Sequence, residues 1–168
     1  NPSSRASALA TLAEIALSRG DQSQALLLAT EATTLYDSLG GLPEIRIPLS
    51  TMAGAYYLQG NYIQALDCER RSLLVARQHR KYSRIAHSHV NLGVLLMESG
   101  QLRRALRAFL RGKRLSQRMQ MLQPEIYARN NIVMCHQYWG DIGAASREYH
   151  LVQSLLEPGA YHHVRDQS

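Results

Sequence analysis

Features that would place this chain outside the cell or in a membrane are missing from its sequence. It holds only two cysteines, Cys68 and Cys135, so neither a disulfide framework nor a thiol metal site is expected. No apolar run approaches the roughly 18 residues that cross a bilayer, and the N-terminal stretch lacks the pattern of a signal peptide. We therefore expect buried thiols, no membrane insertion and a cytoplasmic protein. Because residue 1 is asparagine, we also expect a fragment of a longer chain.

Motifs that carry chemistry are missing as well. The sequence has no Gly-rich phosphate loop, no nucleophile elbow and no cysteine pairs at zinc spacing. His87 and His89 lie two positions apart, so on a helix their rings diverge by about 200° and do not share a metal. His162 and His163 fall in a polar tail, where histidines are usually solvated. The sequence predicts no catalysis, no cofactor and no metal site.

Glycine recurs with a fixed period of 40 residues, and the four copies align without a gap. The glycines are Gly20, Gly60, Gly100 and Gly140. An alanine follows each of them after five residues: Ala25, Ala65, Ala105 and Ala145. Apolar residues recur at helical spacing before each glycine, and no stretch shows sustained strand-like alternation. We predict an all-α chain in which a helix, a tight turn at the glycine and a second helix repeat, with the alanine allowing close approach of the two helices.

Polar residues and prolines are placed to begin the predicted helices. Asp21, Asn61 and Asp141 directly follow three of the glycines and are good helix N-caps. Pro43 and Pro124 occur where a first helical turn tolerates proline. The caps sharpen the glycine turns, and the segments "LGGLPE", "QHRKYS" and "QMLQPE" predict a second set of turns between the repeats.

The repeat pattern resembles the tetratricopeptide repeat (TPR) in its 40-residue variety, as found in bacterial regulators and kinesin-light-chain-like scaffolds. The marks of that family here are the turn glycines, the alanines that follow them, and the pair Leu92 and Gly93 in "NLG". The resemblance extends from residue 6 to about 157. The core position eight residues before each glycine is filled by Leu12, Met52, Leu92 and Ile132.

The resemblance implies a right-handed α-solenoid of four helix-turn-helix repeats, at about 1–40, 41–80, 81–120 and 121–158. These form one predicted domain, 1–158, followed by a polar tail at 159–168. Two departures from the family concern packing. The tryptophan often seen near the repeat start is absent, and the small residue that Gly93 provides in the third copy is Val133 in the fourth.

In this family the first helix of each repeat lines a concave groove, and its relatives hold extended peptides or protein segments there. Asn91 matches the asparagine that commonly holds the peptide backbone, and Asn131 matches its position. An amide can donate to a carbonyl and accept from an N–H at once. The other predicted groove residues are Thr51, Asn130, Gln137, Val90, Val94, Met97, Tyr57, Met134 and Tyr138. Two alternatives stay open, namely that the asparagines bond within the solenoid and that the apolar residues belong to the core.

Positive charge is concentrated in one part of the chain. Of the 19 Lys and Arg residues, 13 fall between residues 70 and 118, where Glu98 is the only acid. Five arginines follow a 4, 4, 3, 4 spacing that puts them on one helix face: Arg103, Arg107, Arg111, Arg114 and Arg118. The resemblance places this basic stripe on the convex side. A solvated face is one interpretation, and docking to an acidic surface is another; nucleic acid is less favoured, because few aromatics accompany the arginines.

Three functional hypotheses follow. The first is a peptide- or protein-binding sensor or scaffold segment of a larger signalling or transcription regulator. The second is a homo-oligomer that assembles through the solenoid ends, since Tyr149, Val152 and Leu155 have no following helix to cover them. The third is docking to an acidic partner or nucleic acid through the basic stripe.

Overall fold

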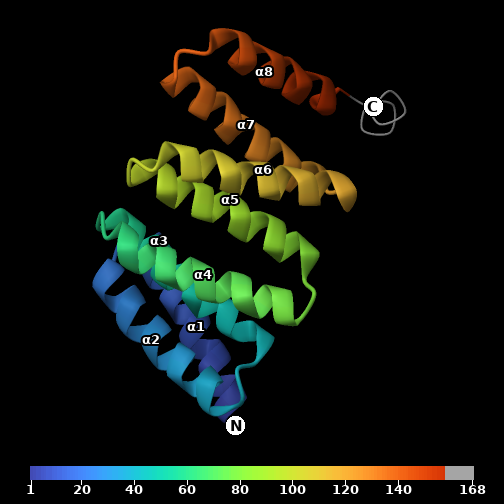
Figure 1. Cartoon of the computed structure of the whole chain (residues 1–168). Helices are drawn as coiled ribbons and strands as arrows, with labels where there is room; N and C mark the ends of the chain where they lie inside the picture. Colours follow the sequence, from blue (N-terminus) through green and yellow to red (C-terminus); the bar gives the residue numbers. More distant parts are fainter. Residues whose placement is uncertain (158–168) are drawn as a thin grey trace. The chain divides into compact units, whose positions relative to one another are not determined.

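The computed structural model describes residues 1–157, and over these residues the chain forms eight α-helices, one short 3-10 helix and no strand (Figure 1). The predicted tail at 159–168 lies outside the described residues. The helices are α1 (Pro2–Ser18), α2 (Gln22–Ser38), α3 (Arg46–Leu58), α4 (Tyr62–Gln78), α5 (Tyr82–Glu98), α6 (Leu102–Arg118), α7 (Leu122–Tyr138) and α8 (Ile142–Leu156), with the 3-10 helix η1 (Pro43–Ile45) before α3. The predicted all-α class and the helix-turn-helix repeats are confirmed.

The four period glycines close the turn inside each hairpin. Their φ angles lie between +73° and +82°, in the left-handed region that side chains with a Cβ rarely adopt. The following helix is capped where aspartate is present, because Asp21 accepts from the backbone N–H of Gln24 and Asp141 from that of Ala144, both at 2.9 Å. Asn61 occupies the same position without a side-chain cap bond.

The turns between hairpins use a left-handed residue at the same 40-residue period. Gly40 has φ +89°, Arg80 has φ +51° and Gln120 has φ +56°. The first copy therefore uses glycine at this position, and the next two hold ordinary side chains in a conformation that costs them free energy.

The helices group into two compact units, Asn1–Lys81 and a second that begins at Tyr82. In the first unit α1 pairs with α2 and α3 pairs with α4, while α3 also contacts α1 and α2. Its core includes Tyr36, Ile45 and Leu49, all buried. Met52 of α3 lies against α2, with its sulfur 3.8 Å from the hydroxyl of Thr33.

The second unit repeats this arrangement with α5 to α8. Helix α6 contacts both α5 and α7, and α5 contacts α7 directly. A Cβ added to Gly93 of α5 would lie 2.3 Å from the ring of Phe109, and one added to Gly112 of α6 would lie 3.2 Å from the carbonyl of Ala86. The two helices of this hairpin therefore approach closely at both glycines, and at Gly93 a side chain would require the Phe109 ring to move.

Two predictions about the core were wrong. Leu12, expected in the core, is 50% exposed, whereas Ile132 at the same repeat position is buried. Met52 packs toward α2, the second helix of the hairpin before its own, and no described helix precedes α1. Val152 and Leu155 were expected to be uncovered, yet both are buried, because they face the interior of their own hairpin.

Candidate functional site

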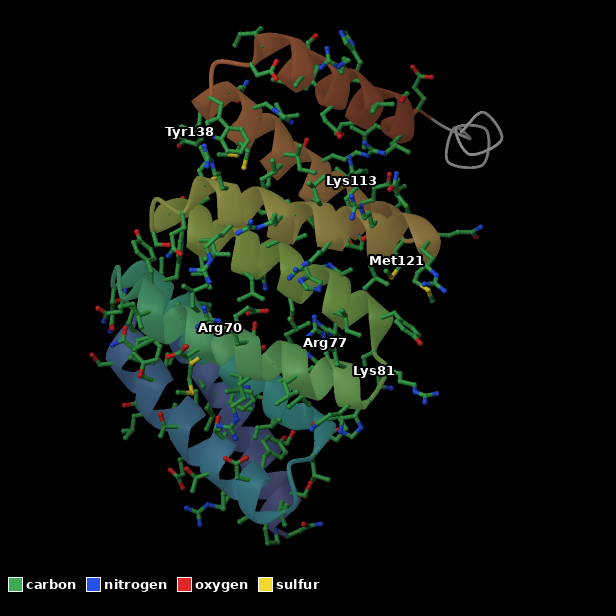
Figure 2. All side chains as sticks on the ribbon, viewed as in Figure 1. Arg70, Arg77, Lys81, Lys113, Met121 and Tyr138 are labelled. Carbon is green, nitrogen blue, oxygen red and sulfur yellow. The ribbon has the colours of Figure 1, made fainter. Side chains whose placement is uncertain are left out.

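A stripe of partly exposed residues runs along α7. Tyr127, Asn131, Met134 and Tyr138 follow one another at intervals of 4, 3 and 4 residues, which places them on one face of the helix. Three of them are large apolar or aromatic side chains left accessible to solvent, and Tyr138 is 69% exposed. Figure 2 labels Tyr138 at the end of α7. The helix thus presents a mixed apolar and amide surface, which is the kind of patch that marks a binding site.

Helix α5 carries the equivalent stripe forty residues earlier. His87, Asn91, Val94 and Glu98 have the same intervals, and all four are at least partly exposed. Because α5 and α7 are in contact, the two stripes belong to neighbouring helices of one unit. We call this pair of stripes the α5/α7 face.

The two asparagines of the α5/α7 face differ in their hydrogen bonding. Asn131 donates one side-chain N–H to the carbonyl of Tyr127 at 2.8 Å, so its second N–H and its side-chain oxygen remain available. Asn91 is exposed, and within residues 1–157 its amide makes no hydrogen bond. The alternative that the asparagines bond within the protein therefore describes Asn131 but not Asn91.

Several predicted groove residues do not lie on this face. Thr51 and Val90 are buried, so a ligand does not reach them; the Thr51 hydroxyl donates to the carbonyl of Ile47, and Val90 lies against Gly112 of α6. Tyr57 belongs to the first unit, where its ring lies 6.0 Å from that of Tyr62.

Three predicted residues border the α5/α7 face. Met97 is partly exposed on α5, and Asn130 and Gln137 are exposed on α7. Tyr127 and His87 were not predicted as groove residues, although the 4, 3, 4 spacing extended by one helical turn would have found both.

Behind the α5/α7 face, a buried ionic network joins three helices. Glu148 of α8 accepts from Lys113 of α6 and from Arg129 of α7, both at 2.5 Å, and Arg129 also pairs with Glu125 at 2.9 Å. Figure 2 marks Lys113 on α6. Burial alone would raise the pKa of Glu148, but the hydrogen bonds and charges of Lys113 and Arg129 outweigh it and hold that pKa below its ordinary value. The network fixes α7 between its two neighbours.

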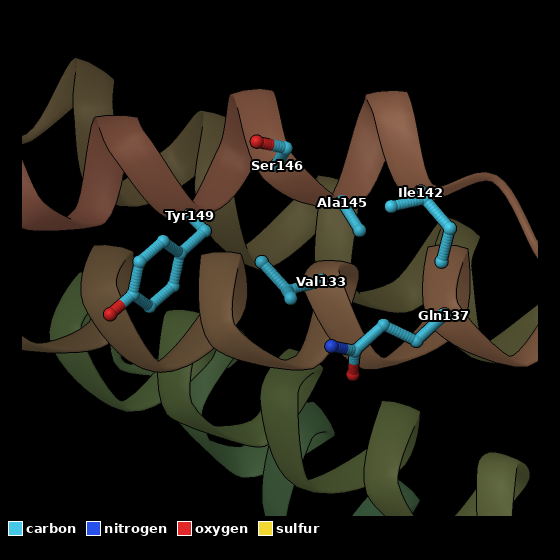
Figure 3. A pocket seen from close by; sticks show the side chains of 6 residues that line it. All are labelled: Val133, Gln137, Ile142, Ala145, Ser146 and Tyr149. Carbon is cyan, nitrogen blue, oxygen red and sulfur yellow. The ribbon is translucent and has the colours of Figure 1, made fainter.

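A hollow of about 320 Å³ opens between α7 and α8 (Figure 3). Its lining is Val133, Gln137, Ile142, Ala145, Ser146 and Tyr149. The third hairpin has no room for such a hollow, because the Phe109 ring fills the space above Gly93. In the fourth hairpin these positions are Tyr149 and Val133, and Tyr149 is 50% exposed. The valine side chain occupies the place that the ring would need, so the hollow follows from the departure seen in the sequence.

The basic stripe of Arg103, Arg107, Arg111, Arg114 and Arg118 lies on α6 as predicted, and all five residues are exposed. The buried residues of α6 face α5 and α7, so the stripe points away from both of those helices.

Among residues 1–157 no group of three His, Cys, Asp or Glu side chains is placed to hold a metal ion. Both cysteines are buried, and burial raises the pKa of the Cys135 thiol to about 11. In the same described part of the chain, every helix is too short or too polar to cross a membrane.

Comparison with known proteins identifies the fold. No family model matches the sequence, and no curated protein matches it either. Solved structures do match: apo RapI (TM-score 0.84, 12% identity) covers 92% of this chain, and a Rap protein in complex with Competence and Sporulation Factor (TM-score 0.81, 17% identity) covers 96%. The TPR-like repeats of a putative kinesin light chain from Podosopora anserina (TM-score 0.75, 15% identity) cover 90%.

These likenesses show that the chain has a TPR-type repeat fold. The chain spans 57% of the RapI chain, 45% of the complexed Rap protein and 75% of the kinesin light chain structure, so it corresponds to about half of the Rap proteins that it matches.

Proposed function

We propose that this chain is a non-catalytic module that binds an extended peptide or protein segment along the α5/α7 face, as part of a larger regulatory or signalling protein. The observation that carries the proposal is the free amide of Asn91 on α5, beside the exposed apolar and aromatic side chains of the neighbouring helix α7. One of the structures with the same fold is a Rap protein in complex with Competence and Sporulation Factor, which supports a binding role for such repeats.

The geometry of neighbouring helices suits an extended segment. Packed helices lie about 8–10 Å apart, and an extended chain advances about 3.3 Å per residue. A segment that crosses α5 and α7 therefore places every third residue beside the next asparagine. Asn91 can both donate to and accept from its backbone, and Asn131 can accept. Tyr127, Met134 and Tyr138 would contact its apolar side chains.

The test is binding of a library of extended peptides to the purified chain and to three variants. Asn91→Ala removes two prospective hydrogen bonds of about 1 kcal/mol each, so we expect a loss of about 30-fold in affinity. Asn131→Ala removes one and should lose about fivefold. Gln64→Ala on α4, an exposed amide of the other unit, is the matched control and should bind as the parent does.

Circular dichroism must show that every variant stays folded. If Asn91→Ala binds the selected peptides as tightly as Gln64→Ala does, the amide does not hold the ligand and the proposal fails. If no peptide binds at all, the α5/α7 face is not a peptide site.

A second candidate is assembly of identical chains end to end. It is favoured by the exposure of Leu12 and Ile15 on α1, since Ile132 and Cys135 at the equivalent positions of α7 are buried. At the other end, Ile142, Tyr149 and Leu156 leave an apolar face on α8. In this arrangement α1 of one copy would pack on α8 of the next as α3 packs on α2.

The repeat register predicts which residues should come into contact between two copies. The contact between Met52 and Thr33, shifted by whole repeats, becomes Leu12 of one copy against Gln153 of another. A chain with Leu12→Cys and Gln153→Cys should then form disulfide-linked multimers under mild oxidation, and the parent should have the mass of a multimer in solution. A monomeric mass at high concentration without crosslinks rules this candidate out.

A further inference from the structure

Every fully exposed residue of α6 is an arginine. Six residues of this helix are exposed, namely the five of the basic stripe and Arg104, and every other residue of α6 is buried or partly buried. The helix contains no acid among its 17 residues. Residues 82–157 hold ten Lys and Arg residues and five Asp and Glu residues, which gives a formal net charge of +5. The basic stripe supplies five of the ten positive charges.

This charge is not compensated within the described structure. The buried cations of the same unit, Lys113 and Arg129, are both paired with carboxylates. By contrast, none of the five stripe arginines makes an ion pair or side-chain hydrogen bond within residues 1–157, and Arg104 contacts only Gln101. Two of the acids of this unit, Glu125 and Glu148, are already engaged in the buried network.

Repulsion between the stripe arginines also destabilises α6. Like charges at i,i+4 repel, and the stripe contains three such pairs along one face. Helix α6 is held in place by its buried face, where Phe109, Gly112 and Ser116 pack, rather than by its surface. A row of guanidinium groups that repel one another is stabilised by a partner of opposite charge.

We infer that the basic stripe of α6 is a docking surface for an acidic helix of a partner protein, with carboxylates spaced as the arginines are. The stripe runs from Arg103 to Arg118, a separation of 15 positions or about 22 Å at 1.5 Å per residue. A second helix with Asp or Glu at 4, 4, 3, 4 spacing keeps the same intervals over this whole length. Each guanidinium group can then meet one carboxylate, in the two-pronged geometry that arginine favours.

Other polyanions match the stripe less well. Residues on one side of an extended acidic segment recur about every 6.7 Å, so four intervals cover about 27 Å and fall out of register. Protein–DNA interfaces combine arginine with neutral donors such as Ser, Thr, Asn, Gln and Tyr. The fully exposed residues of α6 include none of these. The surface also lies on the opposite side of α6 from α5 and α7, so this partner and a peptide on the α5/α7 face could bind together.

The test uses two synthetic alanine-based helical peptides of identical composition. One carries five glutamates at 4, 4, 3, 4 spacing, and its isomer carries the same glutamates spread around the helix. Fluorescence anisotropy at about 50 mM and about 300 mM salt measures their binding to the whole chain, with a random DNA duplex as a third probe. We expect the patterned peptide to bind at least about tenfold more tightly than its isomer, and the higher salt to weaken that binding.

Two charge-matched variants complete the test. The triple variant Arg107→Gln, Arg111→Gln, Arg114→Gln should abolish the preference for the patterned peptide while its melting temperature stays equal or rises. The control Arg19→Gln, Arg84→Gln, Arg147→Gln removes the same charge from exposed sites off the stripe and should keep the preference. Equal binding of the two peptides, no binding of the patterned one, or tighter binding of the duplex would each overturn the inference.

Discussion

Replacing Glu148 by glutamine should weaken the second unit markedly. The carboxylate of Glu148 accepts from Lys113 with one oxygen and from Arg129 with the other, and all three side chains are at least four-fifths buried. Glutamine keeps the shape and one acceptor oxygen, but it removes the negative charge and turns an N–H group toward one of the two cations.

The expected loss can be worked out from these contacts. A hydrogen bond to a charged group contributes about 1.5–3 kcal/mol, and breaking one side of a buried ion pair costs about 3–5 kcal/mol. Arg129 retains Glu125 at 2.9 Å, and Lys113 lies near enough to the surface to recover some hydration. Glu148→Gln should therefore cost about 3 kcal/mol, near the lower end of that range.

Urea unfolding followed by the fluorescence of Trp139 measures this cost, because the only tryptophan of the chain directly follows α7 in the second unit. With a slope of about 2 kcal/mol per molar urea, the midpoint should fall by about 1.5 M. Glu98→Gln, an exposed glutamate of α5, is the matched control and should shift the midpoint little. A loss below about 0.5 kcal/mol for Glu148→Gln, or an equal loss in the control, would refute the reasoning.

The same network sets a pH dependence. The pKa of Glu148 in the folded protein lies below its ordinary value of 4.5, so its stabilisation is fully present above pH 4.5 and is lost as the pH falls through the lower folded value. The difference in stability between the parent and Glu148→Gln should thus shrink in acid. Urea midpoints of both proteins at pH 7 and near pH 3 measure this, and a difference that persists unchanged in acid would contradict the role assigned to the carboxylate.

Three further predictions concern single positions. Gly93→Ala should destabilise the second unit by about 1–3 kcal/mol in urea unfolding, because the added Cβ meets the Phe109 ring. Adding Phe109→Leu should recover part of the lost stability. An unchanged urea midpoint in Gly93→Ala would show that the ring moves aside at little cost. Gln120→Gly should stabilise the same unit by about 0.5–1 kcal/mol, because it relieves the left-handed φ of +56°, whereas Gln123→Gly within α7 should destabilise it. The Cys135 thiol, with its pKa near 11, should stay unreactive toward a thiol reagent at pH 8 until urea unfolds the protein, and rapid labelling of the native chain would show an accessible thiol.

The repeat fold could be predicted from the sequence because its determinants are local and recur. The turn at Gly100, the cap at Asp141 and the buried Ala105 each depend on residues within a few positions of one another. Because four copies share one period, the sequence also predicts which helices pair. The left-handed turns at Arg80 and Gln120 were not predicted, since neither residue type signals a positive φ.

The candidate site was predicted less well, because exposure depends on neighbours that the spacing does not specify. Val90 follows helical periodicity as Val94 does, yet Val90 is buried against Gly112 and Val94 remains partly exposed. Arg129 was not predicted to belong to any site, and its partner Glu148 lies 19 residues away on another helix. Pairings of this kind need the packed helices to be known.

The fit between Gly93 and Phe109 makes the hairpin, rather than the single helix, the smallest piece of this chain that can be exchanged. A first helix with valine at that position requires its partner's ring to lie elsewhere, as Tyr149 does in the fourth copy. Joining α7 to α6 in one hairpin would therefore bring Val133 against Phe109 and prevent closure. Gene rearrangements that cut between hairpins would keep both members of each pair together, and those that cut at the glycine turns would separate them.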